Sequence, residues 1–248
     1  MTNLVALSAT EDRRWKAAKL TRPFDASARH LVDPTAKARY KAVSSRTGVP
    51  WYVIAVIHMR ECPTLRDGSP SFDHSLAQGD RWNQKSIHVP AGRGPFKSWE
   101  DCAVDALVNC APYAARWKDW SIGGILTILE QYNGLGYANR GIASPYIWSG
   151  TDQYVRGKYV ADGRFDPNAV DQQLGCAGLL MAMAVLDREV VFGATPANDN
   201  TATATTTNKP VVVAHPTAAP PPSITHPAPG SLGAWVASAL AALFRKAA

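Results

Sequence analysis

Residues 50–61 read PWYVIAVIHMRE, an apolar run that ends in a glutamate, Glu61. The run starts with a proline, which suits the first turn of a helix. It therefore predicts a helix over residues 50–61 that is buried along most of its length. A carboxyl group at the end of such a helix is costly unless it is paired or used. Burial would raise its pKa, so Glu61 could stay protonated near neutral pH and donate that proton. The alternative is an ordinary solvated residue at a helix end.

The wider pattern predicts a mainly α (α+β) fold. Gly, Pro, Asp and Ser are frequent in residues 62–97, which indicates an irregular lobe or a small β-hairpin. The capping signal Ser98-Trp99-Glu100-Asp101 and the cap-like Asp166-Pro167-Asn168 mark two helix starts. Helices are expected over residues 9–47 (one or two, with breaks at Pro23 and Pro34), 98–109, 120–132 and 166–188.

Composition divides the 248 residues into four parts. Residues 1–48 form a basic helical extension that packs on the domain, and residues 49–193 form the domain itself. Residues 194–230 are rich in Ala, Thr and Pro with almost no charge, which predicts a disordered linker. Residues 231–248 predict an apolar C-terminal helix. Its apolar stretch is shorter than the ~20 residues that span a bilayer, so contact with a membrane surface or a partner fits better.

The formal net charge of +6 is unevenly placed. Residues 1–48 carry ten Lys and Arg against four Asp and Glu, which suggests attraction to nucleic acid, anionic lipid or an anionic cell wall. The basic residues are scattered and are not interleaved with stacking aromatics, so no nucleic-acid partner is expected. A solvated amphipathic helix would explain the same charges.

The cysteines and the N-terminal residues indicate in which cellular compartment the protein is expected. Cys62, Cys102, Cys110 and Cys176 form no CxxC pair and have no metal-like spacing with the six histidines. Reduced thiols are therefore expected, although an oxidising compartment would allow a disulfide. No metal and no organic cofactor is implied. The apolar start of the chain is too short for a signal peptide, so we expect a cytoplasmic protein, which would need another route of release to act outside the cytoplasm.

Residues 72–80, FDHSLAQGD, place carboxylates and an imidazole on a turn after Glu61. If this loop folds back over the helix end, Asp80 or Asp73 could lie across a cleft from Glu61, with His74 beside it. Glycoside hydrolysis uses such a pair of carboxyl groups. The alternative is that these residues only shape a turn.

Two aromatic segments could form a carbohydrate groove. Residues 129–137, LEQYNGLGY, present Tyr132, Asn133 and Tyr137 near a helix end. Residues 144–149, SPYIWS, add Tyr146 and Trp148. Aromatic rings stack on sugar faces, and an Asn amide can hold a hydroxyl or acetamido group. The alternative is a second small hydrophobic core.

Together these motifs resemble the lysozyme-like superfamily. Residues 50–61 are similar to the helix that carries the catalytic glutamate in goose-type lysozymes and lytic transglycosylases, with Cys62 where that family usually has Ser. Residues 132–134, Tyr-Asn-Gly, are similar to its Tyr-Asn-Ala-Gly signature. The resemblance covers roughly residues 49–186 and extends to phage endolysins. The family's usual segment after the glutamate is not recognisable.

The resemblance implies a peptidoglycan-degrading muramidase that acts on glycan strands, with Glu61 as general acid. In a hydrolase, Asp80 would orient or activate water. In a lytic transglycosylase, the alternative, Glu61 would act again as base and no second carboxylate would be needed. A protein that only binds peptidoglycan, or a structural protein of a virion or envelope complex, is a further alternative.

Overall fold

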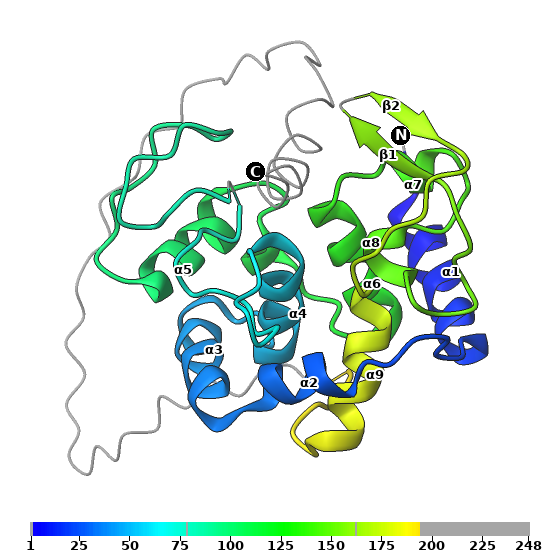
Figure 1. Cartoon of the computed structure of the whole chain (residues 1–248), viewed down its shortest axis with the longest axis horizontal. Helices are drawn as coiled ribbons and strands as arrows, with labels where there is room; N and C mark the ends of the chain where they lie inside the picture. The colour runs from blue at the N-terminus through cyan, green and yellow to red at the C-terminus, as the bar shows by residue number, and fades with distance from the viewer. Residues whose placement is uncertain (1, 78, 162, 194–248) are drawn as a thin grey trace, which may run out of the picture.

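Helix α4 (Trp51–Glu61) lies at the centre of the computed structural model, which describes residues 2–77, 79–161 and 163–193 (Figure 1). The expected helix is thus confirmed. Pro50 caps its start, and every residue from Trp51 to Arg60 is buried. Because the helix is apolar on all sides, it packs against neighbours on several sides, including α3 and α9. The chain leaves it in an extended conformation at Cys62, which places Glu61 at the helix end.

The described residues form a mainly helical fold with one small sheet, so the expected fold class is confirmed at that level. The other helices are α1 (Leu4–Ala17), α2 (Asp25–Val32), α3 (Pro34–Thr47), α5 (Trp99–Asn109), α6 (Ile122–Tyr132), α7 (Gly136–Asn139), α8 (Pro145–Trp148) and α9 (Cys176–Leu186), with a 3₁₀ turn, η1, at Ala114–Arg116. Strands β1 (Lys158–Ala161) and β2 (Arg164–Asp166) pair antiparallel.

Residues 2–48 form three helices rather than one or two, and each packs on a different part of the molecule. Helix α1 lies on α6, α2 on α9, and α3 on α4 and α5. The Asp33 side chain caps α3 by accepting hydrogen bonds from the backbone amides of Thr35 and Ala36. Phe24, Leu31 and Tyr40 belong to the same hydrophobic core as α4. The N-terminal segment is therefore part of the core.

Among the described residues of 62–97 the expected irregular lobe is confirmed, whereas the alternative of a β-hairpin there and the expected start of the last helix are wrong. Residues 62–97 contain no β-hairpin among those described, only isolated bridges such as His74 with Arg81. The hairpin forms instead from β1 and β2. The last helix starts at Cys176 and not near residue 166, because Asp166 uses its carboxylate to accept a hydrogen bond from the Asn168 amide in a turn that follows β2. An Asx turn and a helix cap use the same local chemistry, so the sequence alone did not separate them.

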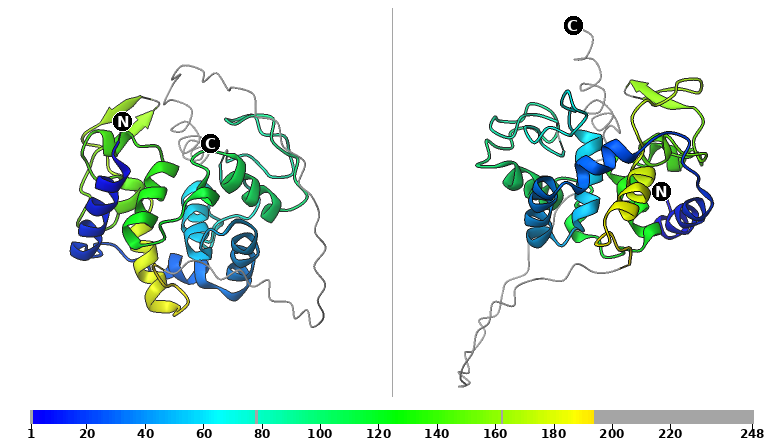
Figure 2. Two further views of the ribbon diagram at one scale, coloured as in Figure 1. Left: turned by 180° about the vertical axis from the view of Figure 1, so that it is seen from behind. Right: turned by 60° about the horizontal axis from the view of Figure 1, so that its bottom comes forward.

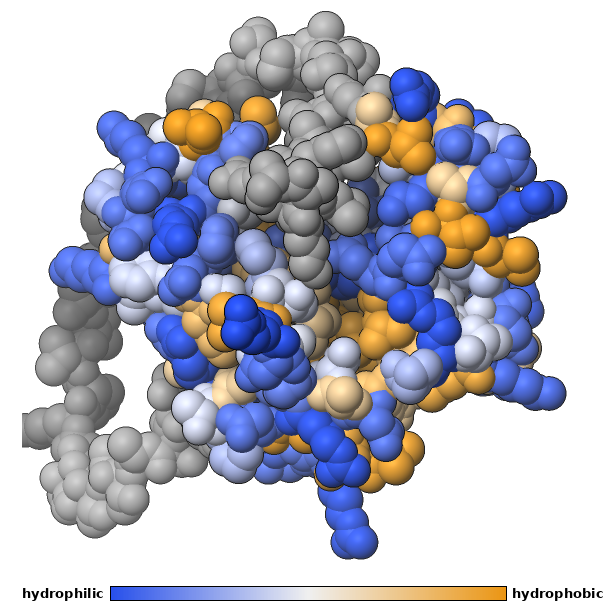
Figure 3. Space-filling model, in the orientation of Figure 1, coloured by the Kyte–Doolittle hydropathy of each residue, from blue (hydrophilic) through white to orange (hydrophobic). Residues whose placement is uncertain are grey.

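The irregular segment 62–97 and the β1–β2 hairpin lie on opposite sides of the helical core (Figures 1 and 2). The surface in Figure 3 carries mostly hydrophilic side chains, and its apolar side chains lie in small separate groups. Among the described residues, no helix is both long and apolar enough to cross a membrane. The expected linker over residues 194–230 and the expected helix over residues 231–248 lie outside the described residues.

Candidate functional site

The end of α4 brings Glu61 against Tyr146 of α8. The Tyr146 hydroxyl donates a hydrogen bond of 2.8 Å to Glu61 Oε1. Tyr146 is only 3% exposed, whereas Glu61 keeps partial exposure at the helix end. One carboxyl oxygen is thus held by a buried donor, in a residue that is itself only partly exposed.

The environment of Glu61 favours its protonated form. Burial raises the pKa of Glu61 to about 7, against the smaller opposing effects of the Tyr146 hydrogen bond and the Arg60 charge. A carboxyl with this pKa is about half protonated at neutral pH. Such a group can donate a proton and later accept one, which is the requirement for general acid–base chemistry.

Arg60 is adjacent to Glu61 in sequence, but its charge is matched elsewhere. Its Nη2 lies 3.0 Å from Asp171 Oδ2, and Lys158 Nζ lies 3.0 Å from the other oxygen of the same carboxylate. The Arg60 guanidinium also lies 4.8 Å from the centre of the Tyr146 ring. Arg60 thus pairs with Asp171 and contacts the Tyr146 ring, and its charge lowers the pKa of Glu61 by less than burial raises it.

The Tyr-Asn motif lies close to this pair. The Tyr132 hydroxyl donates to the backbone carbonyl of Leu76 at 3.0 Å, and the ring is 3% exposed. Burial raises the pKa of Tyr132, and the charge of Glu61 adds to that effect, so the two groups lie within electrostatic range. The Asn133 amide is 3.5 Å from the Ser144 hydroxyl, just before α8. The structure therefore brings Tyr132 and Asn133 to the neighbourhood of Glu61 and Tyr146.

The carboxylate of Asp80, the expected partner of Glu61, is bonded within its own loop. Its carboxylate accepts hydrogen bonds from the backbone amides of Ile87 and His88, both at 3.0 Å, and from His88 Nδ1 at 2.7 Å. Partial burial alone would raise the pKa of Asp80, but these hydrogen bonds lower it overall. It is not among the groups that shift the pKa of Glu61. The nearby backbone carbonyl of His74 accepts a hydrogen bond from Trp99 Nε1 at 3.1 Å, which ties this loop to α5.

Trp148 and Tyr137 are interior residues. Trp148 is fully buried, and its indole N–H donates to Glu11 Oε2 at 2.6 Å, so the expectation that it stacks on a sugar is wrong. The Tyr137 hydroxyl accepts a hydrogen bond from the Tyr159 amide, and the two rings meet edge to face with their centres 5.2 Å apart. The alternative of a hydrophobic core describes both residues better, because a sugar face needs an exposed ring. The same holds for the rings of Tyr132 and Tyr146, which are each 3% exposed.

Sequence reasoning missed Arg60, Asp171 and Glu130. Arg60 and Asp171 are far apart in the chain, and no local pattern pairs them. Glu130 interrupts the apolar run ILTILEQY of α6, which is the one signal that could have singled it out. No group of three or more His, Cys, Asp or Glu side chains that could hold a metal occurs in the part of the chain that the structure describes. All four cysteines are buried, and none forms a disulfide.

No protein-family model, no curated protein and no solved structure matches the chain.

Proposed function

We propose that the protein is a lysozyme-like enzyme that cleaves the β-1,4 bond between N-acetylmuramic acid and N-acetylglucosamine in peptidoglycan, with Glu61 as general acid. The observation that supports this most is the state of Glu61. It lies at the open end of a buried helix, burial raises its pKa to about 7, and a buried tyrosine holds one of its oxygens. Carboxyl groups whose pKa values are shifted strongly by burial are concentrated at functional sites.

The hydrogen bond from Tyr146 assigns different roles to the two oxygens of Glu61. Oε1 accepts from the hydroxyl, so in the protonated carboxyl the proton belongs on Oε2. Proton transfer from Oε2 to the glycosidic oxygen lets the bond to the muramyl C1 break, and Glu61 is left as a carboxylate. The Tyr146 hydrogen bond stabilises that carboxylate, since a bond to a charged acceptor is the stronger one.

Two continuations complete the reaction. In a hydrolase, a second carboxylate activates water, and Asp80 was the candidate. In a lytic transglycosylase, the Glu61 carboxylate takes the proton of the muramyl 6-hydroxyl while the oxygen of that hydroxyl bonds to C1. The product then has an anhydro end. The local hydrogen bonds of Asp80 favour the second route, because it needs only one carboxyl group.

Mass spectrometry of the products from purified peptidoglycan sacculi tests the proposal. The wild-type protein should release soluble muropeptides, with anhydro ends for a transglycosylase and reducing ends for a hydrolase. Glu61→Gln should reduce release by at least about a hundredfold, since it removes the acid. Glu100→Gln is the matched control, because Glu100 forms its ion pair with Arg39 on a different part of the molecule and should keep full activity.

Release by Glu61→Gln at the wild-type rate would show that another group supplies the proton. Binding of the wild-type protein to sacculi without any released fragment would favour the peptidoglycan-binding alternative. Under the proposal the partner is the glycan strand. If the protein is an endolysin, it accumulates in the cytoplasm and reaches the peptidoglycan after the membrane has been permeabilised.

A further inference from the structure

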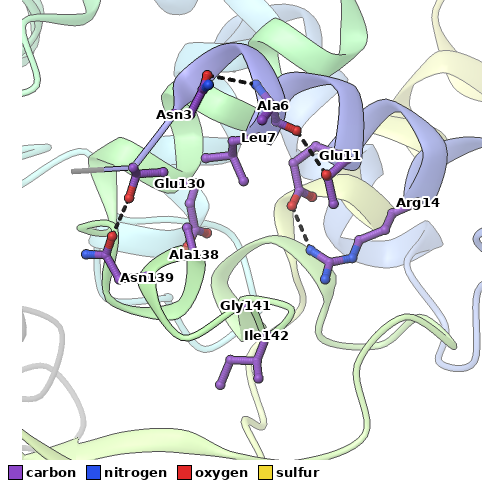
Figure 4. A pocket seen from close by; sticks show the side chains of 12 residues that line it. Asn3, Ala6, Leu7, Glu11, Arg14, Glu130, Ala138, Asn139, Gly141 and Ile142 are labelled. Carbon is purple, nitrogen blue, oxygen red and sulfur yellow. Dashed lines mark hydrogen bonds and ion pairs between the residues drawn. The ribbon is translucent and has the colours of Figure 1, made fainter.

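A pocket of about 460 Å³ lies between α1 and the segment that follows α6 (Figure 4). Its walls come from α1, the end of α6 and residues 138–142. Neither Glu61 nor Tyr146 lines it, so it is separate from the candidate active site. Its volume is in the range of sites that bind small molecules. The residues that matter for its chemistry are Leu7, Glu11, Arg14, Glu130, Ala138 and Ile142.

Glu130 is the unusual member of this wall. The residue is 2% exposed, and neither carboxyl oxygen has a hydrogen-bond partner among the described residues. The Ser144 hydroxyl and the Ala138 backbone lie near the carboxyl group without good hydrogen-bond geometry, and although both favour its charged form, burial outweighs them. A buried carboxyl with two unsatisfied oxygens is costly in a folded protein. A ligand that fills the pocket could supply the missing donors.

Glu11, on the facing helix α1, is a carboxylate in the wall of the same pocket whose two oxygens both have partners, in contrast to those of Glu130. Arg14 Nη1 lies 2.7 Å from its Oε1, and the indole N–H of Trp148 donates to its Oε2. Arg14 is thus already matched to Glu11. Glu130 experiences the like charge of Glu11, which opposes its ionisation, and to a smaller extent the charge of Arg14, which favours it. Of the three ionisable groups that line the pocket, Glu130 is the one that forms no ion pair with a described residue.

We propose that this pocket binds a primary amine on a short aliphatic stem, with the ammonium group donating hydrogen bonds to the Glu130 carboxylate. An ammonium has three donors and no acceptor, which matches a group with two free acceptor oxygens. Leu7, Ala138 and Ile142 provide apolar walls for the stem. The lysine side chain and short alkyl amines have this chemistry. The proposal does not depend on the peptidoglycan activity.

Binding of an amine should release a proton. Burial raises the pKa of Glu130 to about 8, so at pH 7 about nine tenths of the molecules carry the proton. The ammonium favours the carboxylate, so the Glu130 proton passes to the buffer as the ion pair forms, and the amine keeps its own proton. Close to one proton should therefore leave for each amine bound near neutral pH.

Isothermal titration calorimetry of the full chain with n-pentylamine, with n-pentanol as the neutral probe of the same shape, tests the inference. Pentylamine should bind with a heat that depends on the ionisation enthalpy of the buffer, which reports the released proton. Glu130→Gln should weaken binding at least about tenfold and abolish the buffer dependence, since it removes the charge. Glu61→Gln, a second glutamate with a raised pKa outside the pocket, should bind pentylamine as the wild-type protein does.

Absence of pentylamine binding, equal binding of pentanol, or full binding by Glu130→Gln would each overturn the inference. The buffer dependence is measured on the wild-type protein, so the test does not rely on the variant folding. Loss of peptidoglycan lysis in Glu61→Gln with retained amine binding would support both proposals independently.

Discussion

Removal of a single hydroxyl, in Tyr146→Phe, should raise the pKa of Glu61 by about one unit. The phenylalanine ring keeps the contact with Arg60 and removes only the hydrogen bond of 2.8 Å to Oε1. A hydrogen bond to a charged acceptor is worth about 1.5–3 kcal/mol and one to a neutral acceptor about 0.5–1.5 kcal/mol. Their difference, about 1–1.5 kcal/mol, corresponds to about one pKa unit. The pKa of Glu61 should therefore move from about 7 to about 8.

A carboxyl-carbon NMR titration measures this shift directly, with Glu61→Gln to assign the signal. If the protein cleaves peptidoglycan, the alkaline limb of its pH–rate profile should move by the same amount, because the protonated carboxyl is the active form. Activity is lost as the pH rises through the pKa of Glu61, so at pH 8 the variant should keep a larger share of its own maximal rate than the wild-type protein does.

Tyr132→Phe is the matched control. Its hydroxyl bonds to the backbone carbonyl of Leu76 and not to Glu61, so this variant should leave the pKa of Glu61 where it is. An unchanged or lowered pKa in Tyr146→Phe would refute the assigned role of the hydroxyl. An equal rise in both variants would show that the pKa responds to general loosening of the site.

Three further changes test other parts of the structure. Glu130→Gln should flatten the pH dependence of the free energy of unfolding, which urea unfolding at acidic and alkaline pH measures. In the wild-type protein the folded-state pKa of about 8 exceeds the ordinary value of 4.5, so the contribution of Glu130 to stability is full below about pH 4.5 and is lost as the pH rises through 8. The loss should be on the order of 5 kcal/mol. Gly178→Ala should destabilise the fold by about 1–3 kcal/mol in thermal unfolding, because the new Cβ would lie 2.2 Å from the Phe24 ring, and Phe24→Leu should restore part of the loss. Asp80→Asn should weaken the 72–88 loop, seen as faster proteolysis there, yet leave a transglycosylase nearly as active as the wild type; a large loss of activity would favour hydrolysis.

The parts of the fold that follow from local chemistry could be predicted from the sequence. Pro50 and the apolar run after it define α4, and Ser98 caps α5 through the Asp101 amide, as its side-chain chemistry predicts. The start of α9 could not be predicted, because Asp166 satisfies its turn before the helix begins and Gly175 provides no capping side chain. Local sequence signals identify a side chain that can accept a hydrogen bond from a backbone amide, but they do not distinguish a turn from a helix start.

The candidate site could be predicted only in part, for a related reason. Glu61 stands out because it is the one acidic residue of a largely apolar run and lies at its end. The role of Tyr146 depends on where α8 lies relative to α4, and that is a tertiary fact. The spacing of Asp80 made it a candidate partner of Glu61, whereas in the folded loop its carboxylate accepts hydrogen bonds from the amides of Ile87 and His88. Sequence separation does not tell which of several donors a carboxylate will meet.

The packing of the N-terminal helices has a consequence for how the chain is made. Helix α1 rests on α6, and α2 rests on α9, the last helix described. On the ribosome, the first helices therefore emerge long before the surfaces that cover them exist. The face of α2 that packs on α9 therefore stays uncovered until Cys176–Leu186 has been synthesised and has left the exit tunnel. Such long-range closure slows folding and leaves apolar surface open to aggregation. The nascent chain should thus depend on chaperones that shield its first helices until synthesis of the core is complete.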